Sequence, residues 1–193
     1  MIAALVLAAG GSSRLGQPKQ LLPYQGQSLV RRTAEAAFAA GCSPVLVVVG
    51  RDRAAVEMEL RDVSARLLPN EWWERGIGTS IRTGVHAATE CDAVIILACD
   101  QPSISAEAIR RLISARAQTE KSIIASAYAG TLGVPALFAR PHFDALLSLP
   151  DTQGAKAVIA AHPDDITRVE FPDGEIDIDT AGDLAKLAFH QAV

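Results

Sequence analysis

Two cationic side chains, Arg14 and Lys19, lie in a loop of small residues that follows the apolar run Ile2–Leu7. The loop begins Ala8-Ala9-Gly10-Gly11-Ser12, and glycine lacks the Cβ atom that would keep backbone N–H groups away from an anion. Arginine can bind a phosphate group through two parallel hydrogen bonds, and lysine supplies a mobile point charge. The loop therefore predicts a site for the phosphates of a nucleoside triphosphate, held by the two cations and by backbone N–H groups of residues 9–12.

The standard phosphate-binding motifs do not describe this loop. A Walker loop needs Gly-Lys-Ser or Gly-Lys-Thr at the start of a helix, and the glycines at positions 10, 11 and 16 do not form Gly-x-Gly-x-x-Gly. The alternative is a glycine- and serine-rich turn whose two cations are solvated. The loop by itself leaves both interpretations open.

An acidic residue, Asp100, follows a second apolar run, Ile95–Ala98. Open α/β sheets bind ligands beyond the carboxyl ends of their strands, where a residue at this place in the pattern lies. Nucleotide phosphates bring Mg²⁺, which prefers one or two carboxylates together with phosphate oxygens and water. Asp100 is therefore a candidate catalytic and metal-binding residue. The alternative is an aspartate that caps a turn before Pro102.

The segment from Asn70 to Gly84 is a glycine-containing loop that leads into a predicted helix. Thr79 and Ser80 would place hydroxyl groups at the start of this helix, where an anion or a polar base can bind. Asn70, Gly78 and Ser80 are the candidates for contacts with the base and ribose of a nucleotide. Both tryptophans of the chain lie in this loop. They can stack on a flat ligand or close over the core, and we expect at least one to belong to the core.

Two further acids, Asp177 and Asp179, alternate with Ile178 on a predicted strand, so that both carboxylates face one side. Their like charges repel unless a cation lies between them, which is a reason to consider a metal. Solvated charges at the edge of a sheet are the other explanation.

The remaining chemistry-bearing residues predict no site. The four histidines show no metal-ligand spacing, and neither Ser12 nor Ser13 has a visible histidine partner that would make it a nucleophile. The three cysteines, at positions 42, 91 and 99, also lack metal-like spacing. We expect three inert thiols in a reducing cytoplasm.

The elements that position these loops follow an alternating pattern. Strand-like runs alternate with helical patterns, which predicts parallel strands joined by crossover helices and hence an α/β fold. Strands are predicted near 2–7, 44–49, 66–68, 93–98 and 122–126, and helices near 28–40, 54–61, 79–89 and 105–118. After residue 127 the pattern predicts an irregular strand or hairpin over 128–138, helices near 143–147 and 154–160, strands near 166–170 and 175–178, and a last helix to about residue 190.

Length and composition limit the function classes. With 193 residues, 49% of them hydrophobic, the chain is predicted to form one globular domain with a well-buried core. A net charge of −4 without a basic stripe argues against a nucleic-acid partner. The apolar runs are too short to span a membrane, and the start of the chain does not resemble a signal peptide. These features predict a cytoplasmic enzyme.

Four segments together give a specific resemblance. The pattern Leu-Ala-Ala-Gly-x-Ser-x-Arg-Leu-Gly-x-Pro-Lys over 7–19 resembles the signature loop of the MobA-like nucleotidyltransferases. The spacing Asn-x-x-Trp-x-x-Gly-x-x-x-Ser-Ile-x-x-Gly over 70–84 is similar to the branch that makes molybdopterin cytosine dinucleotide, as are residues 97–102 and 176–180. The match runs from Ile2 to the final predicted helix.

This resemblance implies a fold and a reaction. The fold is a three-layer, doubly wound, mostly parallel sheet of Rossmann-like type, with a nucleotide-binding part over about 1–126 and an acceptor-binding part over about 127–193. The reaction joins CMP from CTP to the terminal phosphate of molybdopterin, the molybdenum cofactor, and releases pyrophosphate. A molybdoenzyme would receive the product. Ala8-Ala9-Gly10 resembles the cytidine-using branch, because the guanosine-using branch more often has glycine in place of Ala9.

The resemblance also implies roles for residues. Mg²⁺ would bind to Asp100 and Asp179, while Arg14 and Lys19 neutralise the pyrophosphate that leaves. Gly130, Gly133 and Pro135 resemble the family's segment beside the pterin pocket, and Lys156 belongs to the same acceptor site.

Two departures from the family pattern stand out. Leu15 replaces a common methionine, a change that conserves volume. The segment Asp151-Thr-Gln-Gly-Ala-Lys156 resembles a family Gly-Asp-x-Gly-Ala-Arg segment, with the acid displaced by one residue and lysine in place of arginine. Three alternatives remain open: a guanylyltransferase, a sugar-phosphate or methylerythritol-phosphate nucleotidylyltransferase, and a non-catalytic carrier of the cofactor.

Overall fold

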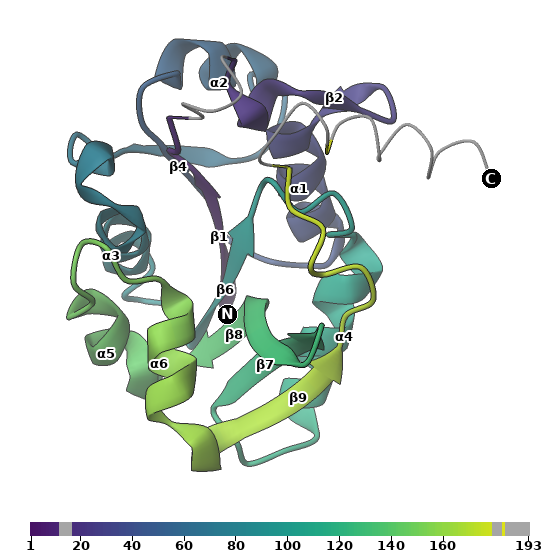
Figure 1. Cartoon of the computed structure of the whole chain (residues 1–193), viewed down its shortest axis with the longest axis vertical. Helices are drawn as coiled ribbons and strands as arrows, with labels where there is room; N and C mark the ends of the chain where they lie inside the picture. Colours follow the sequence, from purple (N-terminus) through teal and green to yellow (C-terminus); the bar gives the residue numbers. More distant parts are fainter. Residues whose placement is uncertain (12–16, 179–182, 184–193) are drawn as a thin grey trace.

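A seven-stranded sheet forms the centre of the computed structural model, which describes residues 1–11, 17–178 and 183 (Figure 1). The strand order is β5-β4-β1-β6-β8-β7-β9, and all neighbours pair in parallel except β8, which is antiparallel to both β6 and β7. The strands are β1 (Ile2–Ala8), β4 (Val45–Val49), β5 (Arg66–Pro69), β6 (Ala93–Ala98), β7 (Ile123–Tyr128), β8 (Thr131–Ala139) and β9 (Ile166–Glu170). A separate small hairpin joins β2 (Pro23–Tyr24) and β3 (Gln27–Ser28).

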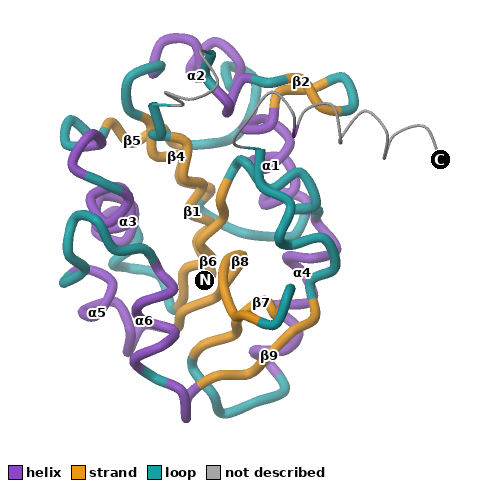
Figure 2. The backbone as a smooth tube through the Cα atoms, viewed as in Figure 1, coloured by secondary structure: helices purple, strands orange, loops and turns teal. Residues whose placement is uncertain are grey.

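Helices cover both faces of this sheet, which confirms the predicted three-layer α/β architecture (Figure 2). One apolar cluster joins α1, α2 and α4 to side chains such as Val6 and Val47, and the other joins α3, α5 and α6 to Leu5 and Val48. Neighbouring strand residues thus point to opposite layers, as the period of a strand requires. The helices are α1 (Leu29–Ala39), α2 (Arg53–Glu59), α3 (Ile77–Ala87), α4 (Ala106–Ala117), α5 (Phe143–Leu147) and α6 (Ala155–Ala161), and the 3₁₀ turns are η1 (Lys19–Leu21), η2 (Trp73–Arg75), η3 (Arg140–His142) and η4 (Pro163–Asp165).

The predicted elements agree with this structure with one exception. The expected hairpin over 128–138 is the junction of β7 and β8, with a bulge between Ala125 and Ser126. The predicted strand over 175–178 is wrong, because turns and irregular backbone occupy that segment. Instead of pairing along a strand, the Ile178 N–H donates to the Asp100 carbonyl oxygen at 3.1 Å, and its side chain is fully buried beside Leu22 and Leu29. Burial against Leu22 and Leu29 therefore accounts for the apolar residue at 178. The predicted last helix lies outside the described residues apart from Asp183, which is helical.

Within the described part of the chain, none of the helices is both long enough and apolar enough to cross a membrane.

The contact between α3 and β1 depends on Gly84. A Cβ atom on Gly84 would lie 2.0 Å from Leu5 Cδ1, and Leu5 is fully buried in the core. This close contact sets how near α3 lies to the sheet. Because α3 begins at the residues that line the candidate site, the packing also positions that site.

Substitution Gly84→Val is expected to lower the free energy of unfolding by about 1–3 kcal/mol through overpacking. Urea unfolding measures the change. The double variant Gly84→Val with Leu5→Ala should lose less than the sum of the two single losses, because the truncated Leu5 leaves room for the new side chain. If the losses of unfolding free energy in the two single variants simply add up in the double variant, the contact between Gly84 and Leu5 is contradicted.

Candidate nucleotide and acceptor site

An ion pair between Lys19 and Asp100 lies at the carboxyl ends of β1 and β6. The Lys19 ammonium group donates to the Asp100 carboxylate, and both side chains are about four-fifths buried, with exposed fractions of 20% and 19%. The two strands are parallel neighbours, with Leu7 opposite Ala98, so the loops that follow them meet at the same edge of the sheet. The structure therefore brings together two predicted site residues that are 81 positions apart.

A cavity of about 190 Å³ contains this pair. Its walls come from the end of β1, the end of β6, η1, and the segment that begins α3. The lining residues are Leu7, Ala9, Gly10, Lys19, Trp73, Ile77, Ser80, Ala98 and Asp100. Five of these, Ala9, Gly10, Lys19, Ser80 and Asp100, are candidates from the sequence, and Trp73 and Ile77 were not predicted as site residues.

The loop after β1 lies against the ring of Trp73. A Cβ atom on Gly11 would be 2.6 Å from this ring, and one on Gly50 would be 2.7 Å from it, so both positions need glycine for the ring to fit. Trp73 packs against the core, whereas the Trp72 side chain is 63% exposed. The expectation that at least one tryptophan belongs to the core is confirmed. Ser12 and Arg14 lie outside the described residues.

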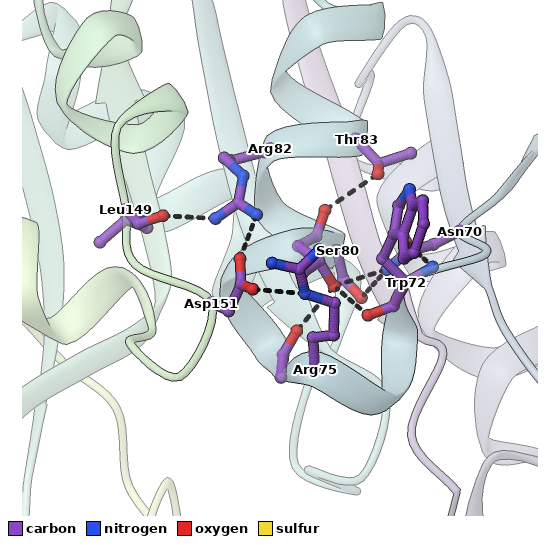
Figure 3. Close-up of polar contacts among 10 residues, drawn as sticks. Asn70, Trp72, Arg75, Ser80, Arg82, Thr83, Leu149 and Asp151 are labelled. Atoms are coloured by element: carbon purple, nitrogen blue, oxygen red, sulfur yellow. Dashed lines mark hydrogen bonds and ion pairs between the residues drawn. The ribbon is translucent and has the colours of Figure 1, made fainter.

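Asn70 shapes the loop before α3 through its side-chain amide (Figure 3). The side chain is buried, and its Nδ2 donates to Thr79 Oγ1 at 2.8 Å and to Ser80 Oγ at 3.0 Å. Its Oδ1 accepts from the Trp72 N–H at 3.0 Å. The amide is thus occupied by internal hydrogen bonds, and its effect on the cavity passes through Ser80. A contact between Asn70 and a base stays a prediction that would require these bonds to rearrange.

Gly78 is a contact point between two loops. Its N–H donates to the Asp151 carbonyl oxygen at 2.8 Å, and a Cβ atom there would lie 2.2 Å from the Pro150 carbonyl oxygen. Glycine at this position therefore allows close approach of two backbones. These backbone contacts do not test the predicted contact of Gly78 with a nucleotide, which stays a prediction.

The carboxylates predicted to hold a metal lie only partly within the described residues. Asp100 is described, and the hydrogen bond to Ile178 brings the segment with Asp177 beside it. Asp179 is outside the described part of the chain. Among the residues that the structure describes, no three histidine, cysteine or acidic side chains form a metal-binding cluster. A single carboxylate beside a phosphate site still matches the ligand set of Mg²⁺, which takes one or two carboxylates. The Asp100 carboxylate therefore fits a Mg²⁺ ion that is also bound by phosphate oxygens.

The predicted acceptor residues cluster around the hairpin of β7 and β8. The Lys156 ammonium group lies 5.7 Å from the centre of the Tyr128 ring. A Cβ atom on Gly133 would be 2.2 Å from the Tyr128 hydroxyl oxygen and 2.8 Å from Lys156 Cε, so both side chains lie directly over Gly133. Pro135 lies on β8, where its carbonyl oxygen accepts from Ser126 Oγ at 2.6 Å. Three of the four predicted acceptor residues, Gly130, Gly133 and Lys156, therefore lie around the tip of the β7–β8 hairpin.

A groove of about 580 Å³ runs beside this cluster. Lys156 and Arg168 are its cationic residues, and its lining is otherwise small, apolar or hydroxyl-bearing. The lining residues are Gly130, Thr131, Leu132, Lys156, Ile159, Ala160, Pro163, Ile166 and Arg168. Arg168 was missed because its place in the groove depends on the pairing of β9 with β7, which the sequence pattern does not reveal.

Gln101, next to Asp100, has an unsatisfied atom. The side chain is 3% exposed, and its Nε2 donates to the Gly174 carbonyl oxygen at 2.8 Å and to the Val134 carbonyl oxygen at 3.3 Å. Its Oε1 is buried and has no hydrogen-bond partner among the described residues. Burial raises the pKa of the Tyr128 hydroxyl group, and the negative charge of Asp177 adds to the effect. Neutral hydrogen-bonding groups thus lie between the ion pair and the hairpin.

The cysteines are buried free thiols, as expected. Burial raises the pKa of Cys42 to about 11 and raises that of Cys91 and Cys99. Because the thiolate is the reactive form, these residues are poor nucleophiles even though Cys99 precedes Asp100.

The family model of the MobA-like NTP transferase domain matches residues 4–166. The chain belongs to this family. Its fold is that of Rossmann-like nucleotidyltransferases, as the resemblance implied.

The chain is similar to proteins that carry different names. Nicotine blue oxidoreductase of Paenarthrobacter nicotinovorans is 33% identical over 142 residues, 73% of this chain and 68% of that protein. Molybdenum cofactor cytidylyltransferase of Escherichia coli is 24% identical over 184 residues, 95% of this chain and 93% of that protein. The structure of Rv0371c of Mycobacterium tuberculosis in complex with manganese has a TM-score of 0.76 and 26% identity, and covers 96% of this chain and 97% of that one.

Substitution Asn70→Ala is expected to cost about 1–3 kcal/mol of unfolding free energy, because the Trp72 N–H and two hydroxyl groups lose a buried partner. The same change should shift the tryptophan emission, since both tryptophans lie in this loop. Thr33→Val is the matched control: it removes a buried hydrogen bond, of 2.9 Å to the Leu29 carbonyl oxygen, on a distant helix. Unchanged emission in Asn70→Ala would contradict the role of Asn70 in shaping the loop.

Proposed function

We propose that this MobA-like nucleotidyltransferase transfers CMP from CTP to the terminal phosphate of molybdopterin and releases pyrophosphate. The observation that carries the proposal is the largely buried Lys19–Asp100 pair in a cavity at the carboxyl ends of β1 and β6. A cation and a carboxylate at this edge are the two groups that a metal-bound triphosphate requires. The resemblance of the full-length E. coli cytidylyltransferase supports the same reaction.

In this reaction an oxygen of the molybdopterin phosphate attacks the α-phosphorus of CTP. The new P–O bond forms as the bond from the α-phosphorus to the bridging oxygen breaks, and that oxygen leaves on pyrophosphate. The chain supplies no covalent nucleophile. Its residues act by positioning and by neutralising charge.

The charged residues predicted from the sequence have roles in this scheme. Lys19, which reaches into the cavity, and Arg14 neutralise the charge that builds on pyrophosphate, while backbone N–H groups of the loop after β1 hold the β- and γ-phosphates. Asp100 would hold Mg²⁺, with Asp179 as the second proposed ligand. When bound, Mg²⁺ neutralises the triphosphate and orients its oxygens. Ser80 and the Trp73 ring bound the space for the nucleotide.

We assign the binding of the acceptor, molybdopterin, to the groove beside the β7–β8 hairpin. Lys156 and Arg168 provide positive charge for an anionic group in the adjoining groove. Guanylyl transfer is the alternative for the nucleotide, and a sugar phosphate or methylerythritol phosphate is the alternative for the acceptor.

Pyrophosphate release with Mg²⁺ and molybdopterin tests the proposal when CTP, GTP, ATP and UTP are compared side by side. Release confined to CTP is expected. Release confined to GTP would contradict the choice of base, and release with a sugar phosphate but not with molybdopterin would contradict the choice of acceptor. Binding of molybdopterin without release from any nucleotide would indicate a carrier.

Substitution Asp100→Asn should lower the turnover rate on the order of 10²–10³-fold, as loss of one electrostatic stabiliser does. Asp92→Asn is the matched control, because Asp92 lies just before β6 and pairs with the N-terminal ammonium group at the opposite end of the same strand. That variant should keep full turnover. Nearly full turnover in Asp100→Asn would rule out the metal-binding role.

A further inference from the structure

The carboxylate of Asp151 joins two arginines from another part of the chain (Figure 3). Its Oδ2 lies 2.7 Å from Arg75 Nε, and its Oδ1 accepts a hydrogen bond from Arg82 Nη2. Arg82 also donates to the Leu149 carbonyl oxygen through Nη1. The loop of residues 149–154 is thereby tied to the loop of residues 70–80 and to the first turns of α3.

The two loops also touch through their backbones. The Gly78 N–H donates to the Asp151 carbonyl oxygen at 2.8 Å. Cβ atoms on Gly76 and Gly78 would lie 2.3 Å and 2.2 Å from carbonyl oxygens of Asp151 and Pro150, so neither position has room for a larger residue. Gly76 has a φ of +134°, a conformation that favours glycine. Side chain and backbone of Asp151 together form the junction.

Each loop leads to one half of the proposed site. The 70–80 loop carries Trp73 and Ser80, which line the cavity with Lys19 and Asp100. The 149–154 loop leads directly into α6, whose second residue is Lys156 in the groove. A displacement of either loop is therefore passed to the other half.

We propose that Asp151 is a positioning residue that fixes the nucleotide-side loop, residues 70–80, relative to the acceptor-side loop, residues 149–154. The inference rests on the proposed function only for the identity of the two ligands. Hydrogen bonds from Arg82 and the charge of Arg75 lower the pKa of Asp151, so the junction stays charged at neutral pH.

A merely structural ion pair would behave differently, and the chain contains one for comparison. Arg31 and Asp62 form a two-bond pair, at 2.7 Å and 2.9 Å, between α1 and the end of the α2 segment, away from both loops. Exposed pairs of this kind contribute little to stability. Asp62→Asn is therefore the matched control for Asp151→Asn.

Hydrogen exchange of the ligand-free protein tests the junction without any assumption about substrate. Asp151→Asn should speed exchange in peptides covering 72–80 and 149–156 by about tenfold, since loss of the junction lets these segments open locally. Asp62→Asn should leave both peptides unchanged, and Asp151→Glu should restore part of the protection. Unchanged exchange in Asp151→Asn overturns the proposal, whether or not the protein transfers CMP.

Steady-state kinetics give the second readout. In Asp151→Asn, kcat/KM for molybdopterin should fall at least about tenfold, because misplaced reactants react slowly. Asp62→Asn should keep the wild-type value. An equal fall in both variants would show a general loss of stability and overturn the positioning role. If the wild-type protein transfers no CMP, the proposed function fails and the exchange experiment alone decides the role of Asp151.

Discussion

The attraction between Lys19 and Asp100 is the interaction on which the site depends. Neither group could be left alone at four-fifths burial, because an unpaired charge in that environment is costly. Pairing makes both tolerable, and it keeps a cation and a carboxylate at the open edge of the sheet. A bound triphosphate and metal can offer each of them a new partner of opposite charge. The contact between Lys19 and Asp100 can thus be replaced by contacts of Lys19 with the triphosphate and of Asp100 with the metal.

The rest of the fold holds this pair in place. The parallel pairing of β1 with β6 fixes the two chain segments side by side, and helices on both faces bury the strands. On one side of the pair, Trp73 fills the space over Gly11 and Gly50. On the other, β8 inserts antiparallel between β6 and β7 and brings the hairpin with Gly130 and Gly133 to the same region. The junction at Asp151 then links the two sides.

Local patterns in the sequence predict much of this arrangement. The apolar runs that become β1, β4 and β6 are continuous, as buried parallel strands require, and the cationic loop and Asp100 follow two of them. The insertion of β8, the pairing of β9 and the contacts of Asp151 depend on residues far apart in the chain, so no local pattern reveals them. The expected strand at 175–178 was wrong for a related reason. Its apolar residue, Ile178, is buried against Leu22 and Leu29 and not by alternation along a sheet.

Transfer of the α-phosphate is the central claim, and isotopic labelling tests it most directly. The protein is incubated with Mg²⁺, molybdopterin and CTP that carries ³²P either at the α- or at the γ-position. If CMP is transferred, α-label appears in the molybdopterin product and γ-label appears only in pyrophosphate. Label in inorganic phosphate, or γ-label on the acceptor, would contradict attack at the α-phosphorus and with it the role assigned to the Lys19–Asp100 cavity.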